Sequence, residues 1–181
     1  MIGWPRGRRS SVAGLLLGLV LVGAWAVERW GPGLISPDRS FAGSVRVCAL
    51  DQVLDGDSLR LDCHGDPLEV RLHCIDAPET DQQPWSDRSR ANLRRITPQR
   101  VEVQPVEIDR FGRTVAEVYA TGVKRYSLNL EQVRGGHAAV YPRYCDDPRF
   151  FRVERQARRA SAGIWSTLGE HQTPWAFRHR R

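Results

Sequence analysis

Two apolar segments in the first half of the chain each end in a turn that carries carboxylates. Asp57 follows the first segment, and Asp76 and Glu79 follow the second. Because such turns lie where buried strands emerge from a sheet, we expect the three side chains to meet at the ends of two neighbouring strands. Carboxylates are ligands that calcium and magnesium prefer. Residues 54–80 therefore predict a sheet of short strands with a metal site at its edge.

The rest of the folded region contains the same kind of short strand. Turn signals of glycine, proline and aspartate separate the first three strands, and such close spacing predicts an antiparallel meander. A longer gap before the fourth strand leaves room for a helix. The expected strands are 44–54, 58–62, 68–75, 101–106 and 114–120.

Three helices are expected from capping residues and apolar periodicity. Ser86 or Asp87 caps the first, Ser127 caps a short second helix, and Asp147 with Pro148 begins the last. Five short strands with a helix between the third and the fourth are the pattern of a Greek-key OB barrel, an α+β fold that binds nucleic acids and oligosaccharides. The expected extents of the helices are 86–96, 127–134 and 148–164.

The N-terminal segment has the order of an export signal. Three arginines precede an uncharged apolar run over residues 12–27, and Ala24-Trp25-Ala26 has the small-x-small form of a signal cleavage site. As a hydrophobic helix, the run would be roughly 24 Å long, which is shorter than the ~30 Å hydrocarbon core of a lipid bilayer. Local thinning of the bilayer would allow a helix of this length to span it. A cleaved signal peptide and a retained membrane anchor both remain open. Either one exports the rest of the chain, as a periplasmic or extracellular protein that is membrane-anchored or secreted.

Basic residues concentrate near the C-terminus. From Arg143 to Arg181 there are nine arginines and only four acids, a local charge of +5 against +6 for the whole chain. Residues 178–181 could contact phosphates, although a solvated helix face and a frayed terminus explain the same charges.

The chain is expected to divide into four segments. They are 1–27 for the signal peptide or anchor, 28–43 for a Gly/Pro/Ser-rich linker, 44–168 for the OB domain and 169–181 for a basic tail.

The four cysteines show no metal-binding spacing, and export favours disulfides. Cys48 and Cys63 are equidistant from the turn at Asp55-Gly56, so they would face one another across a hairpin. We predict a bond between them. Cys74 lies within an apolar strand and could be a buried free thiol.

Two arginines add a possible phosphate site to the carboxylates. Arg113 lies in a turn that begins at Asp109, and Arg71 precedes Asp76 by five residues on one strand. Strict alternation would put Arg71 and Asp76 on opposite faces, so a bulge or twist would have to bring them together. Guanidinium groups match phosphate oxygens bidentately and stabilise the charge that builds during phosphoryl transfer. Phosphodiester hydrolysis is the natural hypothesis.

Five segments occur in an order that resembles the staphylococcal nuclease family, over roughly residues 45–165. They are Leu-Asp-Gly-Asp-Ser, Val-Arg-Leu with Ile-Asp-Ala-Pro-Glu-Thr, Asp-Arg-Phe-Gly-Arg, Leu-Glu-Gln-Val-Arg-Gly-Gly-His-Ala and Gly-Ile-Trp. The closing Thr-Pro-Trp-Ala-Phe-Arg is similar to the tail of bacterial secreted members. The resemblance implies an OB-type barrel with three helices. It also implies calcium-dependent endonucleolytic cleavage of DNA and RNA that leaves 3′-phosphates.

The same resemblance assigns roles to individual residues. Glu79 would act as general base or orient the attacking water, and the two arginines would bind the scissile phosphate. The implied calcium ligands are Asp57, Asp76 and the backbone carbonyl of Ala77. The implied catalytic residues are Arg71, Glu79 and Arg113. The implied substrate contacts are Arg110, Phe111, Tyr141 and Tyr144. Tyr144, with Tyr141 or Pro142, lies where the family has base-stacking tyrosines.

Other functions fit part of the pattern. A catalytically inert nucleic-acid-binding module would keep the barrel and would be expected to lack several of the catalytic side chains. A cell-surface protein-interaction module would show neither metal dependence nor salt-sensitive binding to nucleic acid. The expected partners of the nuclease are single-stranded DNA and RNA as substrates, and the membrane through residues 12–27 if the anchor is retained. A monomer is expected.

Overall fold

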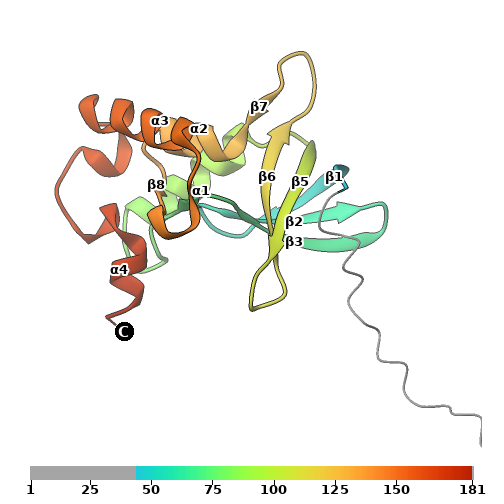
Figure 1. The fold of residues 1–181 in the computed structure, drawn as a ribbon, viewed down its shortest axis with the longest axis horizontal. Helices are drawn as coiled ribbons and strands as arrows, with labels where there is room; N and C mark the ends of the chain where they lie inside the picture. Colours follow the sequence, from blue (N-terminus) through green and yellow to red (C-terminus); the bar gives the residue numbers. More distant parts are fainter. Residues whose placement is uncertain (1–43, 181) are drawn as a thin grey trace, which may run out of the picture. The chain divides into compact units, whose positions relative to one another are not determined.

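The computed structural model describes residues 44–180 of the chain (Figure 1). The predicted export segment, with its hydrophobic helix, and the predicted linker lie outside these residues. Within the described range, no helix is long and apolar enough to cross a membrane.

Five strands close into a barrel. Their order is β3-β2-β1-β5-β6, all neighbours are antiparallel, and a parallel pairing of β3 with β6 closes the barrel. The predicted antiparallel meander of the first three strands is confirmed, and the closed mixed barrel is consistent with an OB-type α+β fold. The strands are β1 Arg46–Val53, β2 Ser58–Cys63, β3 Asp66–Leu72, β5 Arg100–Ile108 and β6 Thr114–Ala120.

Three very short strands lie outside this ring of five. β7 Tyr126–Ser127 extends the edge beside β6, and β4 Ile75–Asp76 pairs with β8 Ala139–Val140. The pairing of β4 with β8 matters for function, because it holds the second predicted carboxylate turn beside residues 141–145.

The barrel core follows from strand alternation. Leu59 and Leu61 on β2 are fully buried, whereas Arg60 between them is exposed. Leu93 of helix α1 (Trp85–Ile96) and Phe150 of helix α3 (Pro148–Arg159) are also fully buried and join the same apolar cluster. The helices therefore close the barrel core, and a second, smaller apolar cluster at the helical end buries Ala157, Ile164 and Trp165.

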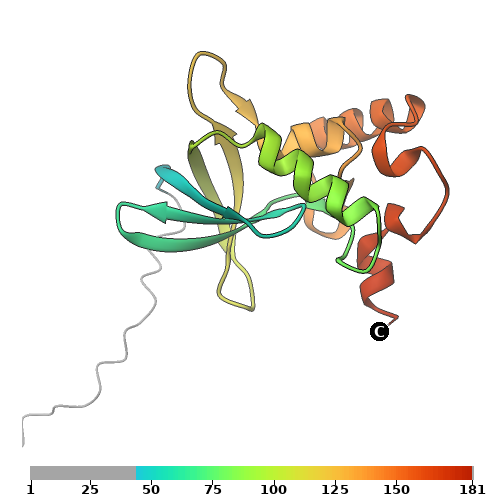
Figure 2. The ribbon, with the colours of Figure 1, turned by 180° about the vertical axis from the view of Figure 1, so that it is seen from behind.

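Three longer helices gather at one end of the barrel (Figures 1 and 2). They are α1 Trp85–Ile96, α2 Leu128–Arg134 and α3 Pro148–Arg159. The predicted N-caps of the last two are confirmed, since Ser127 accepts a hydrogen bond from the amide of Leu130 and Asp147 accepts one from Arg149. α2 packs against α1, α3 and β6, and it connects the helical end to the barrel.

Two helix boundaries differ from the prediction. α1 begins at Trp85, so both predicted caps, Ser86 and Asp87, lie inside the helix. Its N-cap is Pro84, which has no side-chain acceptor, and the Ser86 hydroxyl donates to the carbonyl of Thr80. α3 ends at Arg159 rather than near Ile164. Ser161 has φ of 49°, which ends the helix, and Ile164 is buried in a separate 3-10 turn, Gly163–Trp165.

The C-terminal residues form structure that the sequence pattern did not predict. A 3-10 turn, Glu170–Gln172, leads into the short helix α4 Pro174–Arg178. A further 3-10 turn, Pro142–Tyr144, lies between β8 and α3. α4 is the element that brings the C-terminus to the candidate site.

Two disulfides cross-link the domain. The predicted bond between Cys48 and Cys63 is confirmed and joins β1 to β2. Cys74 is not a free thiol, because the β4–β8 pairing brings it within bonding reach of Cys145, 71 residues further along the chain. The amide of Tyr141 donates to the carbonyl of Cys74 at 2.9 Å, which fixes the same junction.

The two disulfides predict different losses of stability. Replacing Cys74 and Cys145 together with alanine is expected to lower the free energy of unfolding by about 2–4 kcal/mol, because the bond closes a long loop. Replacing Cys48 and Cys63 together is the matched control and should cost less, since that bond closes only 15 residues. Urea denaturation followed by circular dichroism measures both. A larger loss for the Cys48–Cys63 pair would contradict the loop argument.

Candidate active site

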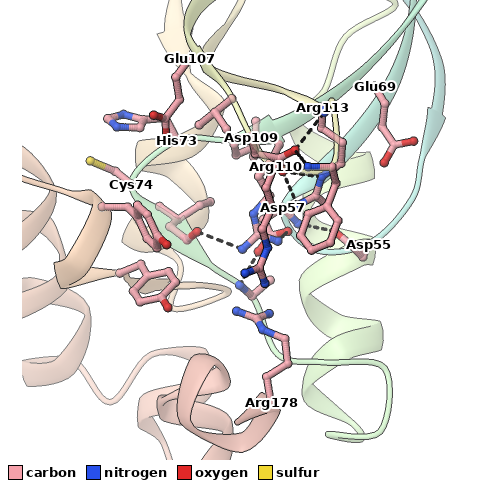
Figure 3. Close-up of a pocket in the computed structure, with 18 of the residues that line it drawn as sticks. Asp55, Asp57, Glu69, His73, Cys74, Glu107, Asp109, Arg110, Arg113 and Arg178 are labelled. Carbon is pink, nitrogen blue, oxygen red and sulfur yellow. Dashed lines mark hydrogen bonds and ion pairs between the residues drawn. The ribbon is translucent and has the colours of Figure 1, made fainter.

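An open cleft of about 810 Å³ lies where β3, β4, the β5–β6 turn, residues 141–144 and α4 meet (Figure 3). Nine of the ten site residues expected from the sequence line this cleft: Asp57, Arg71, Ala77, Glu79, Arg110, Phe111, Arg113, Tyr141 and Tyr144. The tenth, Asp76, is completely buried beneath it. The fold therefore brings together residues that are up to 123 positions apart in the sequence, from Asp55 to Arg178.

A break in the third strand places Arg71 beside Asp76. β3 ends at Leu72, a turn occupies residues 73–74, and β4 begins at Ile75. Cys74 adopts φ of 70°, a left-handed conformation that strands do not use, and the side-chain alternation restarts after it. The conflict expected from strict alternation is therefore resolved by this turn.

Arg71 bridges the two buried aspartates. Its guanidinium pairs through Nη1 with Asp57 and through Nη2 with Asp76. The amide of Ala77 donates to the second oxygen of Asp57 at 2.6 Å. Asp57 is 1% exposed and Asp76 is 0% exposed. This cluster of opposite charges is therefore shielded from water on all sides except the cleft.

Burial and charge oppose one another in this cluster. Burial raises the pKa of Asp57 well above its usual range, although Arg71 and the amide of Ala77 act to lower it. For the Arg71 guanidinium, burial acts to lower the pKa, and Asp57 and Asp76 outweigh it, so the pKa rises and the charge is retained. The charged state of Asp57 therefore depends on a nearby cation.

The Asp55-Gly56-Asp57 turn is held by the helices behind it. Asp55 accepts a hydrogen bond from the amide of Asp57 at 2.9 Å, and Gln132 of α2 donates to the carbonyl of Gly56 at 2.6 Å. A Cβ on Gly56 would lie 2.0 Å from the hydroxyl oxygen of Ser89 in α1. Only glycine permits this contact, so α1 and α2 fix the position of Asp57.

The second arginine is oriented by an aspartate in its own turn. Asp109 accepts hydrogen bonds from the amides of Phe111 and Arg113, at 2.9 and 3.0 Å, and pairs with the Arg113 guanidinium at 2.8 Å. Arg110 lies over the Phe111 ring with 4.7 Å between guanidinium carbon and ring centroid. Phe111 is 70% exposed, so this turn presents two arginines and an open aromatic face to the cleft.

The opposite wall contains two tyrosines. Tyr141 and Tyr144 contact edge to face, with 4.9 Å between ring centroids. The Cys74–Cys145 disulfide follows directly and links this wall to the turn before β4. Tyr144 is half exposed. The tyrosine wall and the carboxylate turn are thus held as one unit.

Arg178 is a site residue that the sequence analysis did not identify. Its Nη2 lies 3.0 Å from both carboxylate oxygens of Asp76, and its Nη1 pairs with Glu79 (Figure 3). Trp175, three residues earlier, stacks on Tyr141 with 5.0 Å between ring centroids and 10° between planes. The signal in the sequence was the closing Thr-Pro-Trp-Ala-Phe-Arg segment. The basic tail alone did not place Arg178 beside a carboxylate.

The donor atoms suit a hard divalent cation. Asp57, Asp76 and Glu79 supply carboxylate oxygens, the chemistry that calcium and magnesium select, and a carbonyl at Ala77 is of the same kind. Across residues 44–180, no group of three His, Cys, Asp or Glu side chains is arranged to hold a metal ion as it stands. The carboxylates instead contact Arg71 and Arg178, which supply the positive charge that the buried cluster requires.

The closed barrel and its cleft define a class: small OB-type barrels with an acidic and arginine-rich site on one face. A family model described as staphylococcal nuclease homologue matches residues 69–167. The chain belongs to the staphylococcal nuclease family.

Three relatives carry names that describe nucleases. A protein named micrococcal nuclease from Shigella flexneri is 35% identical over 136 residues, which cover 70% of this chain and 77% of that protein. An uncharacterized endonuclease from Escherichia coli O157:H7 is 34% identical over 132 residues, covering 72% and 83%. An uncharacterized endonuclease from Haemophilus influenzae is 32% identical over 122 residues, covering 66% of each.

Proposed function

We propose that the chain is a calcium-dependent endonuclease that hydrolyses phosphodiester bonds of DNA and RNA with low sequence specificity and leaves 3′-phosphates. Family membership and the names of the relatives support a nuclease hydrolase. The observation that carries the proposal is the meeting of Asp57, Arg71, Asp76, Glu79 and Arg113 in and beneath one open cleft.

Asp57, Asp76 and the carbonyl of Ala77 would hold the calcium ion. A bound calcium ion supplies positive charge that polarises a phosphate oxygen. The burial of both aspartates favours this use, because a carboxylate removed from water is stabilised by a nearby cation.

The remaining residues of the site would act on the phosphate and the water. Arg71 and Arg113 approach the cleft from β3 and from the β5–β6 turn, so together they can contact oxygens of one phosphate from two sides. Glu79 would take a proton from the attacking water, whose oxygen bonds to phosphorus as the bond to the 5′ oxygen breaks. Asp109 would position Arg113 rather than contact the substrate.

The aromatic side chains fit a substrate of mixed sequence. Phe111, Tyr141 and Tyr144 line the cleft on two sides, and stacking accepts any base because every base has a π-face. Unpaired bases can reach such rings most easily, which supports single-stranded DNA and RNA as substrates. Arg110 adds a positive charge beside Phe111 for the backbone.

The inert nucleic-acid-binding module is not favoured. Such a protein has no need to keep two arginines and a glutamate around buried aspartates, and here all of them occur at one cleft.

We also propose that the nuclease works outside the cytoplasm, as a monomer that is secreted or anchored through residues 12–27. The two disulfides are compatible with that compartment.

A cleavage assay tests the proposed function. The full-length chain, kept in mild detergent because of its apolar N-terminal segment, is incubated with single-stranded DNA in calcium or in chelator. We expect cleavage only with calcium, and products with 3′-phosphates that a polymerase cannot extend until they are dephosphorylated. Lys124→Gln, in the exposed loop after β6, should cleave like the unaltered chain. Absence of cleavage with calcium would refute the enzyme and favour the binding module.

A further inference from the structure

The last helix contacts two parts of the site at once. α4 places Trp175 against the ring of Tyr141 and Arg178 against the carboxylates of Asp76 and Glu79. Figure 3 shows Arg178 entering the site from the side opposite the Asp109–Arg113 turn. A helix of five residues, of which only Pro174 is buried, is held in this position largely by what its side chains contact.

Arg178 lies on the oxygens that the proposed metal site would use. Both oxygens of Asp76 accept from its guanidinium at 3.0 Å, and one of them also pairs with Arg71. Calcium binds carboxylate oxygens directly, at roughly 2.3–2.6 Å. A calcium ion and the Arg178 guanidinium would therefore compete for the same two oxygens, and their like charges would repel one another.

Charge on the guanidinium makes this competition real. A guanidinium group keeps its positive charge in proteins, and that of Arg178 pairs with both Asp76 and Glu79. Its side chain is 40% exposed, whereas the Asp76 side chain is fully buried. Arg178 can therefore leave toward solvent, and Asp76 cannot follow it.

We propose that α4 is a cation-sensitive latch in which Arg178 occupies the carboxylates of Asp76 and Glu79, and calcium displaces it and releases Trp175 from Tyr141. The inference rests on the proposed function, because it takes these carboxylates as the calcium site. Without calcium, the latch neutralises the buried acids and covers one face of a proposed base-stacking ring. With calcium, the ring face becomes free and the guanidinium is available to the substrate.

Calcium binding measured by calorimetry tests the competition. The full-length chain in mild detergent is compared with Arg178→Gln, which removes the competing charge. We expect calcium to bind the variant about tenfold more tightly, equivalent to about 1.4 kcal/mol. Arg180→Gln is the matched control, because Arg180 pairs with Glu170 outside the cleft, and its calcium affinity should equal that of the unaltered chain.

Tryptophan fluorescence reports the movement of α4 separately. Calcium should change the emission of the unaltered chain, and this change should disappear in Trp175→Phe, which leaves the other tryptophans in place. Equal or weaker calcium binding by Arg178→Gln, or a calcium titration that leaves Trp175 emission unchanged, would overturn the latch alone. If calcium binds neither the unaltered chain nor Arg178→Gln, the calcium-dependent function fails and the latch fails with it.

Discussion

Replacing Glu79 with glutamine is expected to slow DNA cleavage by about 10²- to 10⁴-fold, the usual contribution of a positioned general base. Glutamine keeps the size of the side chain but cannot take a proton from water. The backbone at Glu79 is fixed independently, because its amide donates to the side chain of Gln82 at 2.8 Å. The substitution should therefore remove chemistry without moving the turn.

Single-turnover cleavage of a single-stranded oligonucleotide in saturating calcium measures this effect. Glu131→Gln is the matched control, since Glu131 lies on α2 and pairs with Arg134 away from the cleft. Its rate should equal that of the unaltered chain. A Glu79→Gln rate within threefold of the control, with calcium bound, would show that another group takes the proton.

The turns were the most predictable part of the site. Asp57 and Asp76 follow apolar segments, and each acidic turn brings its carboxylate to the cleft, Asp57 in the lining and Asp76 buried beneath it. The contact between Arg71 and Asp76 was harder to predict from the sequence. It depends on positive φ at Cys74, and cysteine gives no signal for that conformation in the way that glycine does.

Contacts between distant short elements could not be predicted. The Cys74–Cys145 bond requires that β4 and β8 pair, and strands of two residues have no periodicity to detect. α4 could not be predicted either, because five residues do not form a stable helix without tertiary contacts. Trp175 and Arg178 acquire a role only through Tyr141 and Asp76, and those contacts are properties of the folded chain.

Two glycines outside the cleft have a packing role that the sequence pattern did not indicate. The second helix was expected to end at residue 134, just before Gly135 and Gly136, and α2 does end at Arg134. The structure adds that Gly136 and Gly163 touch through their backbones. A Cβ on Gly136 would lie 2.1 Å from the carbonyl oxygen of Ala162, and one on Gly163 would lie 2.1 Å from that of Gly136. Close packing thus explains why both segments contain glycine.

Replacing Arg71 with methionine is expected to abolish detectable cleavage and to lower the free energy of unfolding by about 3–5 kcal/mol, because it leaves buried carboxylates without their shared cation. Asp57 is the more affected partner, since Asp76 still pairs with Arg178. Arg60→Met on the neighbouring strand is the control. Arg60 is exposed and only donates to Gln52, so its loss should cost little.

The loss of stability in Arg71→Met should also depend on pH. Burial already raises the pKa of Asp57 and Arg71 opposes that rise, so without Arg71 the pKa of the folded state lies still further above that of the unfolded chain. A raised carboxyl pKa stabilises the folded protein at low pH, and this contribution is lost as the pH rises through the folded-state pKa. Urea denaturation in chelator should therefore show a smaller difference from the unaltered chain near pH 5 than near pH 8. An equal difference at both values would mean that Asp57 does not depend on Arg71 for its charge, and the cluster would then be held by packing alone.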